Sequence, residues 1–445
     1  MKKVLVLGAG LVTRPLVRYL LDQPDFRVTV ASRTVSKAEA LVAGHPSGTT
    51  LTLLADETDK LAGLISEHDL AVSLLPAPLH PVVADLCVKH RKHMVTTSYL
   101  SPAMKALDGP AHEAGVMILN EIGVDPGIDH MSAMRVIDDA KARGGRIVSF
   151  RSYCGGLPAP EANDNPFGYK FSWSPRAVCT AGKSSARFRE DGKQVDVPGP
   201  DLFACVHPLH VEGIGQLEAY PNRDSLGYVD LYGLEGIDTM FRGTLRYPGW
   251  CETLKMIVDL GLLDETPVTY PAGTTYARFV GRFLKSPPSG DVRKSLAGQL
   301  RIDAASPILD RLEWLGLFSD ETIAITGKET TPLDVLGSRM EQKMQYQPGE
   351  RDMIALCHYF LAKFESGPDE RITSTMIDYG QPGGDSSMAR TVSLPAAIAV
   401  RLILTGGLMA PGVHIPVTKE IYGPVLDELA GLDIRCVEKT EPLGA

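Results

Sequence analysis

Paired cysteines are missing from this sequence. It contains seven cysteines, an odd number spread from position 87 to position 436, and none of them forms the Cys-x-x-Cys pair that holds zinc. We therefore expect most of these thiols to be reduced residues of the core, and we expect no metal site.

Long apolar runs and an excess of positive charge are lacking as well. No apolar run approaches the roughly 20 residues that span a bilayer. The N-terminal stretch Val4–Leu7 is followed at once by glycine, so it is interpreted as a buried strand, which points to the cytoplasm. Asp and Glu number 54 against 45 Lys and Arg, a net charge of -9, which argues against binding to a phosphate backbone. The sequence thus predicts neither a membrane nor a nucleic-acid partner.

What the sequence does contain is a regular alternation of short apolar runs and helical segments over residues 3–119. The alternation favours an α/β fold class with a Rossmann-type parallel sheet, because each crossover helix must pack back onto the sheet. Ser101 and Pro102 supply an N-cap and a first-turn proline for the helix that leads into Val116. The predicted strands are Val4–Leu7, Val28–Ala31, Leu51–Leu54, Leu70–Leu75, Met94–Thr97 and Val116–Leu119.

A chain of 445 residues exceeds what one hydrophobic core usually holds, so two or three domains are expected. Many Gly, Pro, Asn and aromatic residues between 154 and 250 predict loops and strands around a ligand site. Helical spacing around Leu296–Leu317 indicates a helical insert. The other predicted elements are a helix over 129–143, a strand over 148–154, a hairpin of 353–364 with 371–379, and C-terminal helices near 389–404 and 425–430 that pack on the first domain.

A glycine-rich turn follows the first predicted strand. Gly8 and Gly10 permit a tight turn and the close approach of a pyrophosphate to the N-terminus of the next helix, whose free N–H groups favour anions. The third glycine of the usual fingerprint is absent, since Thr13 stands there. A simple strand-to-helix turn is the alternative interpretation.

The end of the second predicted strand lacks the acidic residue that commonly binds a ribose 2′-hydroxyl. Ser32, Arg33 and Thr34 stand there instead. A guanidinium flanked by two hydroxyls matches the oxygens of a 2′-phosphate, so NADP(H) is predicted over NAD(H). Alternatively, Arg33 is a solvated surface residue.

Polar residues gather where the fifth and sixth predicted strands end. Ser98 and Tyr99 follow the fifth strand, and Asp125 lies shortly after the sixth. A carboxylate and a phenol at the strand ends could exchange protons with an amine. Alternatively, Asp125 caps the following helix and Tyr99 packs. Cys154 is a further candidate proton donor, with a buried inert thiol as its alternative.

Two later loops place arginines among turn residues and aromatics. Arg223 lies in the first loop, and Arg242 and Arg246 bound the second. Because the guanidinium fork binds carboxylates through paired hydrogen bonds, these loops suit an acidic amino-acid substrate. Structural salt bridges are the alternative.

Several longer segments resemble one known family, the glutamate-forming saccharopine dehydrogenases, also called saccharopine reductases. The resemblance covers essentially the whole chain and is far more specific than a glycine loop. The matching segments are Val95–Tyr99, Asn120–Gly123, Asp125–His130, Ser152–Glu161, Asp164–Pro166, Gly168–Ser174, Tyr220–Ser225 and Arg242–Tyr247.

The resemblance implies an NADP(H)-dependent enzyme that condenses 2-aminoadipate 6-semialdehyde with glutamate and reduces the imine to saccharopine, or catalyses the reverse oxidation. It also implies a homodimer. The three implied domains are a Rossmann domain over 1–125 and 386–445, an α/β substrate and dimerisation domain over 126–257 and 346–385, and a helical insert over 258–345.

Residue roles also follow from the resemblance. Saccharopine is expected to contact Ser98, Tyr99, Asp125, Arg223, Thr244, Leu245 and Arg246. NADP(H) is expected to contact Leu11, Val12, Thr13, Arg14, Ser32, Arg33, Thr34, Leu74, Leu75 and Pro76, together with the glycines of the turn. Asp125, Tyr99 and Cys154 are the candidates for proton transfer. The alternatives are a carboxynorspermidine or carboxyspermidine dehydrogenase and a non-catalytic NADP-binding regulatory protein.

Overall fold

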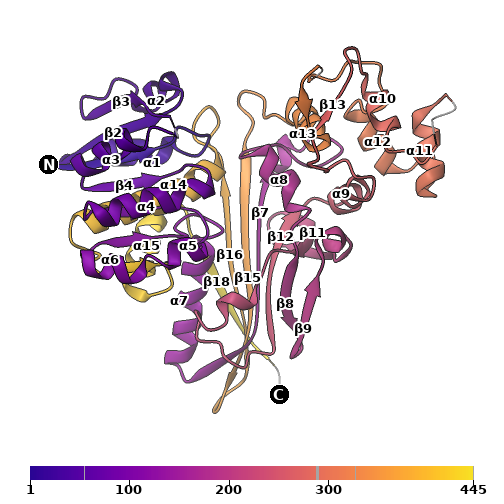
Figure 1. Cartoon of the computed structure of the whole chain (residues 1–445). Coiled ribbons are helices and arrows are strands. Elements are labelled where there is room, and N and C mark those ends of the chain that lie inside the picture. Colours follow the sequence, from indigo (N-terminus) through magenta and orange to yellow (C-terminus); the bar gives the residue numbers. More distant parts are fainter. Residues whose placement is uncertain (55, 287–289, 326, 444–445) are drawn as a thin grey trace. The chain divides into compact units, whose positions relative to one another are not determined.

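The computed structural model describes residues 1–54, 56–286, 290–325 and 327–443. The chain divides into two compact units (Figure 1). Unit 1 comprises Met1–Val148, Asp230–Glu235 and Met353–Ala445, and unit 2 comprises Ser149–Val229 and Gly236–Asp352. The three-domain division expected above stays a prediction. Residues 287–289 and 326 of its helical insert, and residues 55 and 444–445 of its Rossmann domain, lie outside the described residues.

Unit 1 contains a parallel sheet of seven strands in the order β17-β6-β5-β4-β1-β2-β3. The first six strands along the chain confirm the predicted alternation. The seventh, β17, was not predicted and extends the sheet beside β6. The strands are β1 Lys2–Leu7, β2 Phe26–Ser32, β3 Gly48–Thr52, β4 Leu70–Ser73, β5 His93–Val95, β6 Met117–Leu119 and β17 Gly412–His414.

Helices join these strands and cover the sheet. Residues Val4–Leu7 of β1 are fully buried, and burial of each such side chain contributes about 1.5–3 kcal/mol. The Ser101 hydroxyl accepts a hydrogen bond from the Met104 amide at 3.2 Å, as expected of an N-cap. The helices are α1 Arg14–Leu21, α2 Val35–Val42, α3 Thr58–Glu67, 3-10 helix η1 Ala77–Leu79, α4 His80–Lys89, α5 Pro102–Lys105 and α6 Asp108–Ala114. The single helix expected after Ser101 is thus two helices.

The remainder of unit 1 comes mainly from the C-terminal part of the chain. The predicted hairpin is confirmed, because β15 and β16 pair antiparallel from Met353 with Tyr379 to Ala362 with Glu370, and β18 pairs with β16. The helices α14 and α15 pack on α1 and α7 of the same unit (Figure 1). Their bounds are α7 Ile128–Ala142, β15 Asp352–Phe364, β16 Glu370–Tyr379, α14 Ser387–Leu404, α15 Lys419–Gly431 and β18 Val437–Pro442.

Helix α14 is the most apolar helix of this group. By length and composition alone it could cross a membrane, since its 18 residues have a mean hydropathy of 1.4. However, 78% of this stretch is buried inside the structure, and it packs against α1, α15, β4 and β5. These contacts are those of a core helix in unit 1.

Unit 2 is built on strands in the order β10-β11-β12-β7, with β8 and β9 pairing beside β12. Helices expected from the spacing near Leu296–Leu317 are present as α11 and α12, with a two-stranded sheet of β13 and β14 beside them that was not predicted. The elements are β7 Gly145–Pro158, η2 Pro160–Ala162, α8 Pro175–Ala181, β8 Ala186–Glu190, β9 Lys193–Val197, η3 Gly199–Ala204, β10 His207–Val211, β11 Gly215–Pro221, η4 Leu226–Tyr228, β12 Thr239–Arg246, α9 Trp250–Asp259, β13 Val268–Thr269, α10 Tyr276–Gly281, α11 Val292–Leu300, α12 Pro307–Trp314, β14 Glu329–Thr330 and α13 Pro332–Lys343.

Candidate active site

The glycine-rich turn of unit 1 is closed tightly against strand β4. Gly8 has a φ of +112°, and a Cβ there would lie 2.9 Å from the carbonyl oxygen of Leu74. Its amide donates to the Ala31 carbonyl oxygen at 2.9 Å. At Gly10, by contrast, a Cβ would meet no heavy atom within 4 Å. A larger residue at the first glycine would therefore clash with the backbone of Leu74, whereas the second glycine leaves open space above the turn.

Thr13 stands where the third glycine of the fingerprint would be. Its side chain is fully buried, and its hydroxyl accepts a hydrogen bond from the Gly10 amide at 3.1 Å. Arg14 begins α1 and forms an ion pair with Asp385 at 2.6 Å. Leu11 is 70% exposed and Val12 is half-buried. The turn therefore presents exposed backbone and side chains directly before the N-terminus of α1, where an anion is favoured.

Arg33 is exposed at the end of β2. No carboxylate of the described residues pairs with its guanidinium, unlike that of Arg14. The neighbouring Ser32 hydroxyl accepts a hydrogen bond from the Thr34 amide at 3.2 Å, which holds this strand end in a compact turn. A cation and two hydroxyls at this position fit a 2′-phosphate.

Tyr99 and Asp125 are brought together in unit 1. The Tyr99 hydroxyl donates to Asp125 Oδ1 at 3.1 Å, and both side chains are partly exposed. The N-cap residue of α7 is Gly127, with no side-chain cap, so Asp125 does not occupy the capping position that the alternative interpretation gave it. A phenol and a carboxylate in direct contact can pass a proton to or from a bound amine.

A buried network behind this pair was not predicted from the sequence. Glu121 Oε1 accepts the Leu100 amide at 2.8 Å, and its Oε2 lies 2.8 Å from His130 Nε2. His130 Nδ1 contacts the Tyr232 hydroxyl at 2.5 Å. Glu121 also has a φ of +58°. Because Leu100 directly follows Tyr99, the network fixes the loop that carries the tyrosine.

Ser98 belongs to a second chain of side-chain hydrogen bonds that was missed. His80 Nε2 lies 2.8 Å from Ser98 Oγ, and His80 Nδ1 lies 2.8 Å from Ser73 Oγ. Burial lowers the pKa of His80 to about 4. The imidazole is therefore neutral near pH 7. Leu74 and Leu75, which follow Ser73, are half-buried, and Pro76 is exposed.

Unit 2 brings Cys154 and Thr244 together. Thr244 pairs with Cys154 of β7 on one side and with Tyr220 of β11 on the other, so the three residues stand in one row across the sheet. Cys154 is 8% exposed and Leu245 is fully buried. A ligand that approaches this row would therefore contact Thr244 more directly than the buried side chain of its neighbour Leu245.

Arg246 lies among aromatic rings in unit 2. Arg246 is only 5% exposed, and its guanidinium lies 4.9 Å from the ring centroid of Tyr169 and 5.5 Å from that of Trp250. Its Nη1 donates to the Leu245 carbonyl oxygen at 2.7 Å. Its Nε, also buried, has no hydrogen-bond partner among the described residues. Such an unmet donor of a cation is the feature that a bound carboxylate or water would satisfy.

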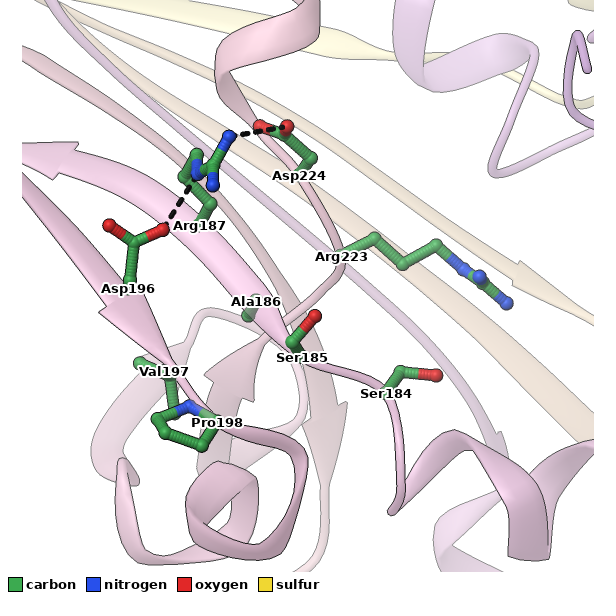
Figure 2. Close-up of a pocket in the computed structure, with 9 residues that line it drawn as sticks. All are labelled: Ser184, Ser185, Ala186, Arg187, Asp196, Val197, Pro198, Arg223 and Asp224. Atoms are coloured by element: carbon green, nitrogen blue, oxygen red, sulfur yellow. Dashed lines mark hydrogen bonds and ion pairs between the residues drawn. The ribbon is translucent and has the colours of Figure 1, made fainter. Parts of the chain in front are cut away.

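Arg223 lines a cavity of about 580 Å³ with Ser184, Ser185 and Asp224 among its other residues. Figure 2 shows its side chain extended away from the ion pairs of Arg187 with Asp196 and Asp224. Arg246 is not among the lining residues of this cavity. That Arg223 and Arg246 bind the terminal carboxylates of one substrate stays a prediction.

The fold and the turn together define a class. The strand order β3-β2-β1-β4-β5-β6, with a glycine turn after β1, is that of the Rossmann-type dinucleotide-binding proteins. Residues 4–119 match the family model of the saccharopine dehydrogenase NADP binding domain, and residues 123–434 match that of the saccharopine dehydrogenase C-terminal domain. The chain belongs to the saccharopine dehydrogenase family.

Known proteins resemble the chain over its full length. It is 41% identical to saccharopine dehydrogenase [NADP(+), L-glutamate-forming] of Schizosaccharomyces pombe, covering 99% of each chain. The apo saccharopine dehydrogenase (L-Glu forming) structure from Saccharomyces cerevisiae matches with a TM-score of 0.90 and 40% identity, over 99% of this chain and 100% of that one. A mitochondrial alpha-aminoadipic semialdehyde synthase of Bos taurus is 39% identical over 96% of this chain and 46% of its own length.

Proposed function

We propose that this chain is an NADP(H)-dependent saccharopine dehydrogenase of the L-glutamate-forming type, active in lysine metabolism. The observation that carries the proposal is the 41% identity to such an enzyme over 99% of both chains. The arrangement of unit 1 supports it, since a dinucleotide turn and a phenol–carboxylate pair follow strands of one parallel sheet. Ligands of open parallel sheets bind at this carboxyl edge.

The reaction converts saccharopine, NADP+ and water into glutamate, 2-aminoadipate 6-semialdehyde, NADPH and a proton. When bound, NADP+ supplies the acceptor for a hydride from the carbon of the secondary amine. The resulting imine adds water, and its carbon–nitrogen bond then breaks to release the glutamate amine and the aldehyde. The protein therefore has to take a proton from the amine, activate water and protonate the leaving nitrogen.

The cofactor side of the site is assigned to the turn and the strand ends of unit 1. Gly8, Gly10 and residues Leu11–Arg14 would hold the pyrophosphate at the N-terminus of α1. Ser32, Arg33 and Thr34 would hold the 2′-phosphate, and residues Leu74–Pro76 would border the ring system. The exposure of Arg33 and the open space at Gly10 support this assignment.

The substrate-binding residues are assigned by their roles. Tyr99 and Asp125 would transfer protons, with Ser98 as a hydrogen-bonding partner of the substrate. Arg223 and Arg246 would each bind a carboxylate, and Thr244 and Leu245 would contact the substrate beside them. Cys154 is the other candidate for proton transfer. The unmet Nε of Arg246 and the cavity at Arg223 support the arginine assignments.

We also propose a cytoplasmic homodimer. The resemblance to the family is the support for the dimer, and the seven free cysteines are consistent with a reducing compartment. Sedimentation or light scattering of the purified chain would measure the mass of the assembly. A mass equal to one chain would contradict the dimer without touching the catalytic proposal.

One assay tests the proposed activity. Purified protein with saccharopine and NADP+ is expected to produce NADPH, followed by its absorbance, and to react more slowly with NAD+. Diamine-derived carboxy-amines serve as alternative substrates. Turnover of these in preference to saccharopine would identify the chain as a carboxynorspermidine or carboxyspermidine dehydrogenase. Tight NADPH binding without turnover of any amine would identify a non-catalytic NADP-binding protein.

A further inference from the structure

A buried histidine connects two serines at the ends of neighbouring strands. Ser73 ends β4, His80 begins α4 and Ser98 follows β5. His80 Nδ1 and Nε2 each lie 2.8 Å from one serine oxygen, Ser73 Oγ and Ser98 Oγ respectively. Ser73 is fully buried, His80 is 3% exposed, and Ser98 is only half-buried. The chain of hydrogen bonds thus runs from the interior to the surface of unit 1.

The donors and acceptors in this chain of hydrogen bonds determine which nitrogen of the His80 imidazole carries a hydrogen. A neutral imidazole donates through one nitrogen and accepts through the other. The Ser73 hydroxyl has His80 Nδ1 as its one side-chain partner in the described part of the chain. If Nδ1 donated to Ser73, the serine hydrogen would be left without an acceptor at a fully buried position, which is unfavourable. Ser73 therefore donates to Nδ1, and the hydrogen of His80 is on Nε2.

The position of the hydrogen on His80 also determines whether the Ser98 hydroxyl can donate to a ligand. Because Nε2–H donates to Ser98 Oγ, one lone pair of that oxygen is occupied and the hydroxyl hydrogen of Ser98 points away from His80. We propose that His80 is a positioning residue that makes the Ser98 hydroxyl a hydrogen-bond donor to an anionic oxygen of the substrate, a carboxylate of the amino acid. The inference rests on the proposed function, in which Ser98 touches saccharopine.

Burial keeps this arrangement constant over the working pH range. The pKa of His80 is lowered to about 4 by desolvation alone, so the imidazole does not gain a second hydrogen near neutral pH. A doubly protonated ring would donate to both serines and leave Ser73 unsatisfied. His80 accordingly takes no part as a general acid or base, and its removal should leave the shape of the pH–rate profile unchanged.

The hydrogen position can be measured directly in the protein without ligands. In protein carrying 15N-histidine, the ring nitrogens of His80, assigned by comparison with His80→Gln, are expected to show hydrogen on Nε2 and none on Nδ1 at neutral pH. Hydrogen on Nδ1 would overturn the proposal. This measurement does not depend on turnover, so it tests the hydrogen position on His80 separately from the proposed activity.

Kinetics then test whether His80 acts through Ser98. Ser98→Ala and His80→Leu are each expected to raise KM for saccharopine about tenfold, the loss of one hydrogen bond to a charged group, with kcat changed much less. The double variant should be no worse than Ser98→Ala alone. Multiplied losses would refute the positioning role, as would an effect confined to kcat. Ser73→Ala, which removes only the buried donor, is the second variant should His80→Leu not fold.

His68→Gln provides a matched control. His68 is also buried in unit 1, 7% exposed, and its Nε2 lies 2.8 Å from the Thr29 hydroxyl. Within the described part of the chain, no hydrogen bond links it to Ser98. This variant should leave KM for saccharopine unchanged, and affinity for NADPH should stay the same in both histidine variants. An equal rise of KM in His68→Gln would mean that the rise in His80→Leu comes from general loosening of unit 1, and it would overturn the proposal.

Discussion

The hydroxyl of Tyr99 donates to the carboxylate of Asp125 across 3.1 Å. The two residues follow different strands, β5 and β6, that lie side by side in the parallel sheet. Their contact therefore depends on the register of the sheet as much as on the two loops. In such a pair the phenol can give its proton to the substrate nitrogen, and the carboxylate can take up a proton that the amine or an attacking water releases; imine formation and hydrolysis require both transfers.

Replacing either partner should remove most of the proton transfer. Asp125→Asn and Tyr99→Phe are each expected to lower kcat for saccharopine oxidation by a factor of about 10² to 10⁴, the usual contribution of a general acid or base. The pH dependence of kcat/KM should lose one limb in the more severely affected variant. An Asp125→Asn enzyme with the pH profile of the unmodified protein would exclude Asp125, and Cys154→Ala should then be examined in the same assay.

The choice between NADP(H) and NAD(H) should depend on Arg33. Because its exposed guanidinium has no carboxylate partner in the described residues, Arg33→Ala is expected to weaken NADPH binding about tenfold or more and to leave NADH binding nearly unchanged. Arg27→Ala is the control, since Arg27 is also exposed on β2 but donates to the Pro46 carbonyl oxygen. Equal weakening of both cofactors in Arg33→Ala would remove the 2′-phosphate assignment.

Arg223 and Arg246 should differ in what their loss does to stability. Arg223 is exposed, so Arg223→Ala should raise KM for saccharopine while the melting temperature stays within about 1–2 °C, as for most surface substitutions. Arg246→Leu should also raise KM strongly, and it should lower stability by about 1–3 kcal/mol because the ring contacts of a buried cation are lost. Thermal unfolding beside steady-state kinetics measures both effects. Unchanged kinetics in Arg246→Leu would refute its part in binding the substrate.

The protein should lose stability at mildly acidic pH, and protonation of His80 should account for part of this loss. Its pKa lies near 6.5 in the unfolded chain and at about 4 in the folded protein, so the unfolded chain binds more protons between these values. The neutral ring therefore contributes full stability above pH 6.5, and about 3 kcal/mol of it is lost as the pH falls toward 4. Denaturant unfolding at a series of pH values should show a shallower decline in His80→Gln. Parallel declines in the two proteins would contradict this prediction.

Much of the fold could be predicted because its signals are local. Val4–Leu7 and Val28–Ala31 are apolar, β-branched runs bounded by turn residues, and they are strands. The helix expected from Ser101 to Val116 is interrupted because Pro110 is tolerated only in a first turn, so a new helix begins at Asp108. Strand β17 has only three residues and pairs with β6 across a long stretch of sequence, so no local pattern could reveal it.

The types of residue in the candidate site could be predicted from the sequence, but the contacts between them could not. The motifs pointed to Tyr99, Asp125 and the arginines, since these types suit an acidic amine. Three contacts depend on side-chain directions that are set by packing between distant segments. They are the contact of Tyr99 with Asp125, that of Ser98 with His80, and that of Arg246 with the aromatic rings around it. A histidine two residues after Pro78 carried no signal, because a satisfied core histidine looks the same in sequence.

The late position of β17 affects how the protein is synthesised. The backbone edge of β6, with Met117, Ile118 and Leu119 all nearly inaccessible in the finished protein, has no neighbour until residue 412 has been translated. While the ribosome produces the intervening residues, this apolar edge can pair with other nascent chains. A fragment ending at residue 119 should therefore aggregate, although it contains the complete glycine turn, and coexpression with the C-terminal segment should restore its solubility.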